Sequence, residues 1–194
     1  MSARIKPVTV QRPANSKTGE KGALPNFGGN IWAHRPKTFQ AFSDFYQARA
    51  DEAQFEPRLS ELVRLRIAFH NQCRTCMALR FAPDSVSEGD VCSLEKPEEA
   101  PDLTSRERAA LHFADLFAIN HLAIDDKMFD GLREHFNEGE LVELSIWCAI
   151  CVGFGRMGAT WHMTDELPES YKANLDRRET LRGHHDAYVV SKST

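Results

Sequence analysis

Apolar residues recur every three or four positions in several stretches of the chain, which is the spacing of an α-helix that buries one face. After Pro36, whose fixed φ suits the first turn of a helix, the residues Phe39, Phe42, Phe45 and Tyr46 follow this spacing. We expect them to form one aromatic stripe that packs in the core.

A second helix is predicted from about Pro57 to His70, where three leucines and a phenylalanine keep the same period. Its polar positions include Glu61, Arg64 and Arg66, which could form a solvated face. A carboxylate in a first helical turn is also an ordinary partner of the helix dipole. The residues alone therefore leave Glu61 open between a surface role and a functional one.

Capping residues mark three further helices. Thr104 with Glu107 has the pattern of a capping box, Asp125 can cap a shorter helix, and Asn137 with Glu140 is typical of another helix start. Residues 147–158, WCAICVGFGRMG, are apolar almost all round, which is typical of a helix at a bundle centre or a subunit interface. These patterns predict an all-α helical bundle.

Breaker residues separate these helices from less regular stretches. We expect residues 77–82 to form a short helix that Pro83 ends, and the polar residues 84–102 to form a loop. Residues 1–23 are predicted to be a flexible N-terminal arm, and residues 177–194 a polar C-terminal tail. Residues 24–176 would then form a single domain.

Composition narrows the class of protein. The formal net charge of −4 comes from interspersed charges, so nothing favours binding to nucleic acid. The polar N-terminus has no apolar signal core, and no apolar run approaches the length of a membrane span. We therefore expect a soluble cytoplasmic protein that binds no membrane.

Five cysteines in a chain with no secretion signal favour redox, metal or core roles over a disulfide framework. Cys73 and Cys76 form a Cys-x-x-Cys pair, and at a helix start the free backbone N–H groups favour a thiolate. Cys76 is our first candidate for the nucleophile. Cys92 is predicted to be a bystander, with a resolving thiol as the alternative.

The position of Glu61 tests this hypothesis, because one continuous helix would place it roughly 22 Å from Cys76. A chain reversal near His70 or Asn71, with a new helix starting around Cys73, would bring the carboxylate back beside the thiol. Asn71 tolerates the left-handed conformation that commonly closes a helix. We therefore predict a break there.

A metal site is the competing use of these thiols, because Cys148 and Cys151 form a second Cys-x-x-Cys pair. The two pairs lie far apart in sequence and the second is in an apolar helix, where cysteine behaves as a small hydrophobe. His184 and His185 have no partner ligand nearby in sequence. We expect no metal and no bound cofactor.

The spacing of Glu61, Cys73 and Cys76 resembles the pattern Glu-x11-Cys-x-x-Cys-x3-His of the carboxymuconolactone decarboxylase superfamily, in its alkylhydroperoxidase D branch. Arg80 stands where that pattern has its histidine, and Thr75 replaces a further histidine found in alkylhydroperoxidase D. The resemblance implies an alkylhydroperoxidase D-like helical bundle that assembles as a homo-oligomer, with a trimer or hexamer expected.

The resemblance also implies a thiol peroxidase or disulfide oxidoreductase with a redox-active disulfide. Cys76 would attack a small-molecule peroxide or related electrophile, Cys73 would resolve the sulfenic acid, and an external thiol or dithiol would reset the pair. Glu61 would serve in proton transfer. Arg80 cannot release a proton, so we expect it to stabilise the Cys76 thiolate and to pair with Glu61.

Two alternatives remain open. One is a decarboxylase acting on a muconolactone, or another lactone-acting enzyme, which would not need the cysteine pair. The other is a non-enzymatic oligomeric helical module in which Cys73 and Cys76 only tie a turn. Loss of thermal stability on reduction without turnover would favour this last reading. The sequence identifies neither the physiological substrate nor the reductant.

Overall fold

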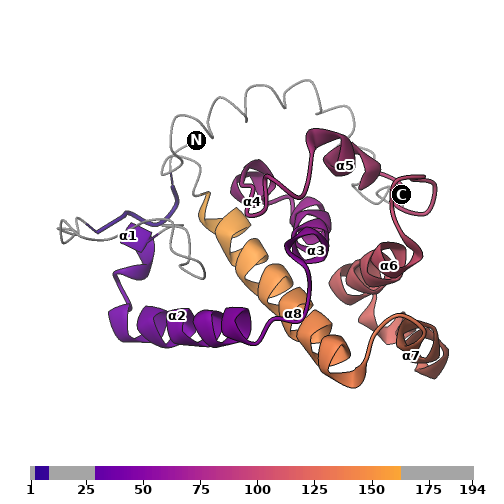
Figure 1. The fold of residues 1–194 in the computed structure, drawn as a ribbon. Coiled ribbons are helices and arrows are strands. Elements are labelled where there is room, and N and C mark those ends of the chain that lie inside the picture. The colour runs from indigo at the N-terminus through magenta and orange to yellow at the C-terminus, as the bar shows by residue number, and fades with distance from the viewer. Residues whose placement is uncertain (1–2, 9–28, 163–194) are drawn as a thin grey trace.

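The computed structural model describes residues 3–8 and 29–162, and these ranges contain helices and no strand, as the sequence predicts (Figure 1). Most of the expected N-terminal arm, all of the expected C-terminal tail and the outer parts of the expected domain lie outside the described residues. The helices are α1 (Gly29–Trp32), α2 (Pro36–Asp51), α3 (Pro57–His70), α4 (Arg74–Ala78), α5 (Glu88–Ser93), α6 (Ser105–Ile119), the 3-10 turn η1 (His121–Ala123), α7 (Asp126–Arg133) and α8 (Glu138–Trp161).

Helix α3 is the central element of the fold, and it packs against α4, α6 and α8. Every residue from Glu61 to Phe69 is buried, which excludes the solvated face, one of the two interpretations that the sequence left open. The reason is that neighbouring elements cover α3 on several sides. The polar residues Glu61, Arg64 and Arg66 are consequently buried and need partners inside the protein.

Two groups of apolar side chains lie on different sides of α3. One joins α3 to α6, α7 and α8 and includes Val63, Phe113, Leu132 and Leu144. The other joins α3 to α4, α5 and the segment before α6, and includes Leu62, Leu65, Met77 and Leu94. Burial of these side chains on both sides fixes α3 in the molecule.

The predicted caps are confirmed. Thr104 and Asn137 each form a capping box with the residue three positions later, and the Asp125 side chain accepts a hydrogen bond from the Met128 N–H. The prediction of a loop over residues 84–102 is wrong in part, because a further capping box of Ser87 with Asp90 starts α5. Cys92 lies on α5 and is exposed.

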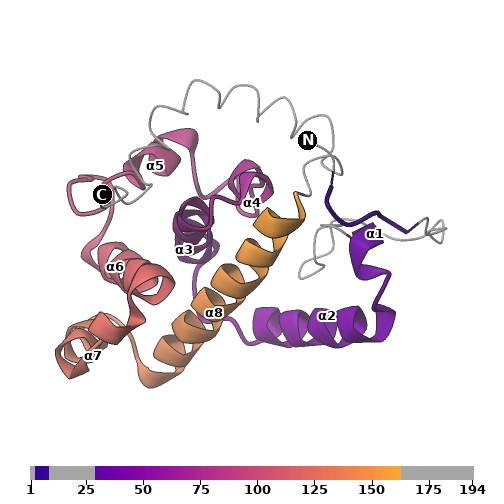
Figure 2. The ribbon, with the colours of Figure 1, turned by 180° about the vertical axis from the view of Figure 1, so that it is seen from behind.

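Helix α2 lies on the side of α8 that faces away from α6 and α7 (Figures 1 and 2). It contains no fully buried residue, and Phe45 of the predicted stripe is 47% exposed. The expectation that the whole stripe packs in the core is therefore wrong. Phe39, Phe42 and Tyr46 instead form one wall of a cavity, described below.

Helix α8 carries the apolar segment that the sequence places at a bundle centre. By length and composition alone, its 24 residues could also cross a membrane, but core helices of soluble proteins meet the same criterion. In this fold α8 packs against α3, α4 and α6. Its left-handed C-cap, His162, ends the helix directly after Trp161.

Gly155 allows α8 to approach the end of α3 closely. A Cβ atom at this position would lie 2.4 Å from Asn71 Nδ2, whereas at Gly153 a Cβ atom would meet nothing within 4 Å. Gly155→Ala should therefore lower the free energy of unfolding by about 1–3 kcal/mol through overpacking.

Gly153→Ala is the matched control, because it should raise this free energy by up to about 1 kcal/mol through helix propensity. Urea unfolding followed by circular dichroism measures both changes. Equal effects of the two substitutions would contradict the close approach at Gly155.

Candidate functional site

The chain reverses directly after α3, as predicted. The helix ends at His70 with Asn71 as its C-cap, and Cys73 is the N-cap of α4. The left-handed residue is Gln72, with φ of 50°, whereas Asn71 keeps right-handed helical angles. The sequence therefore located the break, but it assigned the left-handed conformation to the wrong neighbour.

Asn71 fixes the reversal through its side chain instead. Its Nδ2 donates a hydrogen bond to the Cys151 carbonyl at 2.9 Å, and its Oδ1 accepts one from Arg156 Nε at 3.2 Å. Both partners lie on α8. These bonds attach the turn before α4 to the central face of α8.

Cys73 and Cys76 form a disulfide across the first turn of α4. The Cys73 sulfur also accepts a hydrogen bond from the Cys76 backbone N–H at 3.2 Å. Cys73 is only 1% exposed, whereas Cys76 is partly exposed and lines the cavity. Cys76 is therefore the cysteine of this pair that a small molecule in the cavity can reach.

Glu61 is 2% exposed and is held by three donors. Arg64 binds it in a bidentate manner, with Nε to Oε2 and Nη2 to Oε1 both at 2.7 Å. The backbone N–H of Phe81 donates to Oε1 at 2.9 Å. Both oxygens of this buried carboxylate thus accept hydrogen bonds inside the protein.

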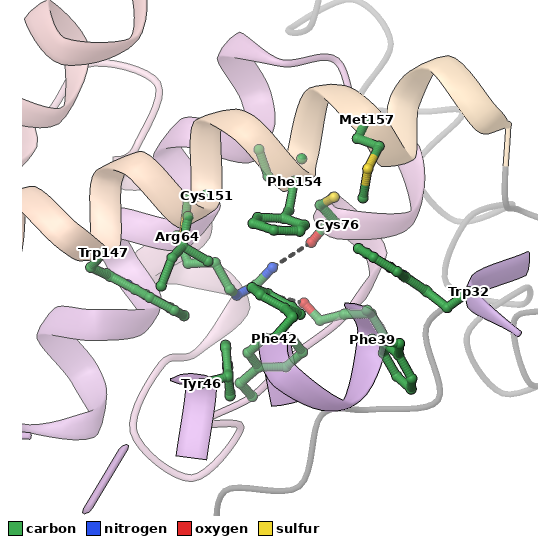
Figure 3. Close-up of a pocket in the computed structure, with 15 residues that line it drawn as sticks. Trp32, Phe39, Phe42, Tyr46, Arg64, Cys76, Trp147, Cys151, Phe154 and Met157 are labelled. Atoms are coloured by element: carbon green, nitrogen blue, oxygen red, sulfur yellow. Dashed lines mark hydrogen bonds between the residues drawn. The ribbon is translucent and has the colours of Figure 1, made fainter. Parts of the chain in front are cut away.

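Arg64 connects Glu61 to the cysteine helix. Its Nη1 donates to the Cys76 carbonyl at 2.7 Å, its Nη2 donates to the Leu79 carbonyl at 2.8 Å, and its guanidinium lies 4.3 Å from the Phe81 ring centroid. Figure 3 shows the bond from Arg64 to Cys76. Helix α4 ends at Ala78, earlier than the predicted residue 82, and Arg64 satisfies two carbonyls there.

The predicted ion pair between Arg80 and Glu61 is wrong. Arg80 instead pairs with Glu88, with Nε to Oε1 at 2.9 Å, and donates to the carbonyls of Met77 and Leu79. The physical reason is that Leu79 is extended, so Arg80 does not continue the helical face that carries Cys76. Arg80 also does not line the cavity.

The cavity has a volume of about 120 Å³ and lies between α2, the Cys76 region and α8 (Figure 3). Aromatic side chains from distant parts of the chain dominate its lining: Trp32, Phe39, Phe42, Tyr46, Phe81, Trp147 and Phe154. Cys76, Arg64 and Cys151 line it as well. The structure therefore places a disulfide sulfur residue beside an aromatic pocket.

Two titratable groups of this lining are kept neutral. Burial raises the pKa of the Cys151 thiol to about 12, although the charge of Arg64 opposes this shift. Burial also raises the pKa of the Tyr46 hydroxyl, against the effect of Arg49. At neutral pH Cys151 is thus a protonated, weakly nucleophilic thiol, and Tyr46 is a neutral phenol that can donate a hydrogen bond.

Cys148, the first thiol of the second cysteine pair, has the properties of a core residue. Cys148 is fully buried, and burial raises its pKa well above the ordinary value. Within residues 3–8 and 29–162, no group of three or more His, Cys, Asp or Glu side chains could hold a metal ion. His184 and His185 lie outside the described residues.

Sequence reasoning missed Arg64 and the cavity lining. The three-residue spacing of Glu61 and Arg64 is a signal for an ion pair on one helix face, and it could have identified this arginine. No comparable signal exists for Trp32 and Phe154, because helices far apart in sequence bring them together. The aromatic stripe contained Phe39, Phe42 and Tyr46, but it did not indicate that they line a cavity.

No family model matches the chain. Uncharacterized proteins from two strains of Mycobacterium tuberculosis are 33% identical to it over 120 residues, which is 59% of this chain. The chain spans only 42% of the length of these curated relatives.

Three solved structures share the fold. An alkylhydroperoxidase AhpD core protein from Ralstonia eutropha, described as an uncharacterized peroxidase-related protein, has a TM-score of 0.63 and 23% identity, and the match covers 73% of this chain and 76% of that one. A protein of unknown function from Agrobacterium tumefaciens, proposed to be an AhpD antioxidant defence protein, has the same score and identity over 72% and 97% of the chains. The debrominase Bmp8 has a TM-score of 0.65 and 20% identity over 80% and 87%. The resemblance drawn from Glu61, Cys73 and Cys76 is thus confirmed at the level of the fold.

Proposed function

We propose that this chain, which has the alkylhydroperoxidase D-like fold, is a dithiol-dependent peroxidase in which Cys76 attacks the peroxide and Cys73 resolves the product. The observation that carries the proposal is the disulfide across α4, with Cys76 on a cavity and Cys73 sealed beneath it. Because Cys73 and Cys76 are three residues apart, their disulfide can be reduced and formed again without a large rearrangement of the fold.

The division of labour between the two sulfurs follows from their surroundings. The residue that meets substrate must lie on the cavity, and Cys76 does. Cys73 is buried behind it and is already within bonding distance of its sulfur. We infer that the guanidinium of Arg64, which binds the Cys76 carbonyl, favours a thiolate at Cys76 in the reduced protein.

The reaction balances as follows. The Cys76 thiolate attacks the terminal oxygen of a hydroperoxide, the O–O bond breaks, and the leaving alkoxide takes a proton to become an alcohol. Cys73 then attacks the Cys76 sulfenic acid, forming the disulfide and releasing water. An external dithiol returns two electrons and two protons to the pair.

We assign positioning roles to Glu61 and the arginines. All three hydrogen bonds that Glu61 accepts come from Arg64 and Phe81, so this carboxylate orients Arg64 rather than taking the thiol proton directly. Arg64 then holds the Cys76 carbonyl. Arg80 binds the carbonyls at the end of α4, and we propose that it supports this helix end.

The remaining expectations from the sequence also belong to the proposal. They are an external thiol or dithiol reductant, a homo-oligomer, a cytoplasmic location and a redox disulfide in place of a bound cofactor. The apolar character of α8 supports an oligomer, because an incompletely buried apolar helix favours further association.

Steady-state reduction of tert-butyl hydroperoxide by dithiothreitol tests the proposed function. Cys76→Ser should reduce the protein-dependent rate by at least about 100-fold, because the nucleophile is lost. Cys92→Ser is the matched control, since Cys92 is exposed on α5 away from the cavity lining, and it should retain the wild-type rate.

Dimedone labelling gives a second readout. In Cys73→Ser the sulfenic acid cannot be resolved, so peroxide should allow dimedone to label Cys76, as mass spectrometry of tryptic peptides would show. Equal turnover of the wild type and Cys76→Ser would refute the proposed peroxidase.

A further inference from the structure

Three of the rings that line the cavity stack on one another. Trp32 and Phe42 have ring centroids 5.8 Å apart with an interplanar angle of 6°, and Phe42 and Phe154 have centroids 4.0 Å apart at 22°. Trp32 also stacks on Phe154 at 5.8 Å. The faces that these rings turn toward one another are covered, so another aromatic ring would contact the edges and outer faces of the stack.

The size of the cavity limits the ligand. Its volume is about 120 Å³, and in other proteins a closed apolar cavity of about 150 Å³ admits benzene. The present cavity is open at one side, so a ring with a small substituent can enter with the substituent directed outward or toward a polar group. Hydrogen peroxide alone would leave this apolar surface without a partner.

Two polar side chains of the lining have hydrogen-bond donors that no described residue uses. The Tyr46 hydroxyl makes no hydrogen bond to any described residue, although the side chain is largely buried. All but one of the N–H groups of Arg64 bind Glu61, Cys76 or Leu79, and the remaining one is on Nη1. An oxygen atom of a ligand in the cavity could accept a hydrogen bond from the Tyr46 hydroxyl.

We propose that the organic part of the substrate is a single aromatic ring with an oxygen-containing substituent, bound against Trp32, Phe42 and Phe154 with its oxygen toward Tyr46. This assignment of a substrate class rests on the proposed function for its chemistry, because Cys76 lines the same cavity. The binding itself depends only on the cavity and can be measured without turnover.

The test uses the disulfide form of the protein and three probes: phenol, toluene and cyclohexanol. Phenol and cyclohexanol have the same number of heavy atoms and the same hydroxyl group, so they differ in ring chemistry. Saturation-transfer NMR and titration calorimetry should show phenol binding about three- to tenfold more tightly than cyclohexanol. Equal dissociation constants, or no saturable phenol binding, would overturn the proposal.

Tyr46→Phe tests the hydrogen bond and keeps the ring. This variant should weaken phenol binding about two- to tenfold, the usual effect of losing one hydrogen bond. Toluene has no oxygen, so its affinity should stay unchanged. An equal loss for phenol and toluene would mean that Tyr46 acts only by packing, and would refute the polar half of the proposal.

The binding and turnover experiments test the aromatic site and the peroxidase independently of one another. Selective phenol binding without any peroxide turnover would sustain the aromatic site and refute the peroxidase. Peroxide turnover without aromatic selectivity in binding would sustain the peroxidase and refute the substrate class. Circular dichroism of Tyr46→Phe before each titration verifies that the variant is folded.

Discussion

Arg64→Ala is expected to lower the free energy of unfolding by about 3–5 kcal/mol, the usual cost of breaking a buried ion pair. The substitution leaves the carboxylate of Glu61 buried, with only the Phe81 N–H as a donor. It also removes the donors to the carbonyls of Cys76 and Leu79. The substitution should therefore destabilise the contact between α3 and the end of α4. Urea unfolding would measure the loss of stability.

Removing both charges should be less harmful than removing one. In Glu61→Gln with Arg64→Met the buried uncompensated charge is absent, so part of the stability should return relative to Arg64→Ala. Arg133→Ala is the surface control, because the ion pairs of Arg133 involve exposed side chains, and it should cost less than about 1 kcal/mol. A similar small cost for Arg64→Ala would contradict the buried network.

Asp115→Asn should have the second largest effect, about 2–4 kcal/mol at neutral pH. The carboxylate lies between Arg66 and His70, with Oδ1 2.6 Å from His70 Nε2 and Oδ2 2.8 Å from Arg66 Nη2. Arg66 is itself buried, so the substitution removes a charged partner from a buried cation. The cluster joins α6 to the end of α3, directly before the turn that leads to Cys73.

The effect should depend on pH. Burial alone would raise the pKa of Asp115, but hydrogen bonds from His70 and Arg66 outweigh it, and the pKa is lowered from the usual 3.8. The folded state therefore binds fewer protons than the unfolded state, so this stabilisation is full above the unfolded pKa and is lost as the pH falls through the folded pKa.

Urea unfolding of the wild type and Asp115→Asn at several pH values between about 6 and about 3 would measure this dependence. The difference in stability between the two proteins should shrink toward the acid end. Asp130→Asn, at an exposed ion pair, should show almost no difference at any pH. A constant difference for Asp115→Asn would contradict the lowered pKa.

Local sequence signals predicted much of the fold. The helix at residues 57–70 begins and ends where its proline, its apolar period and its chain break indicate. Thr104, Asp125 and Asn137 cap the next helices through contacts made within three residues. Such features depend on neighbours along the chain, so they can be recognised without the tertiary structure.

The remaining features depend on neighbours that are distant in sequence. Arg64 and Arg66 have the pattern of a surface face, and only the packing of α6 and α8 around α3 makes them interior residues. Pairing Arg80 with Glu61 requires a helix that continues to Arg80, whereas α4 ends at Ala78. Predicting the cavity would require the positions of α2 and α8 relative to one another, and no local sequence pattern contains this information.

Helix α4 has only five residues, and a helix so short is not stable alone in water. The disulfide between Cys73 and Cys76 holds its beginning, and hydrogen bonds from the guanidinium of Arg64 hold its end. Reduction of the disulfide does not remove the hydrogen bonds from Arg64. The local backbone can therefore keep its shape through a cycle of reduction and oxidation.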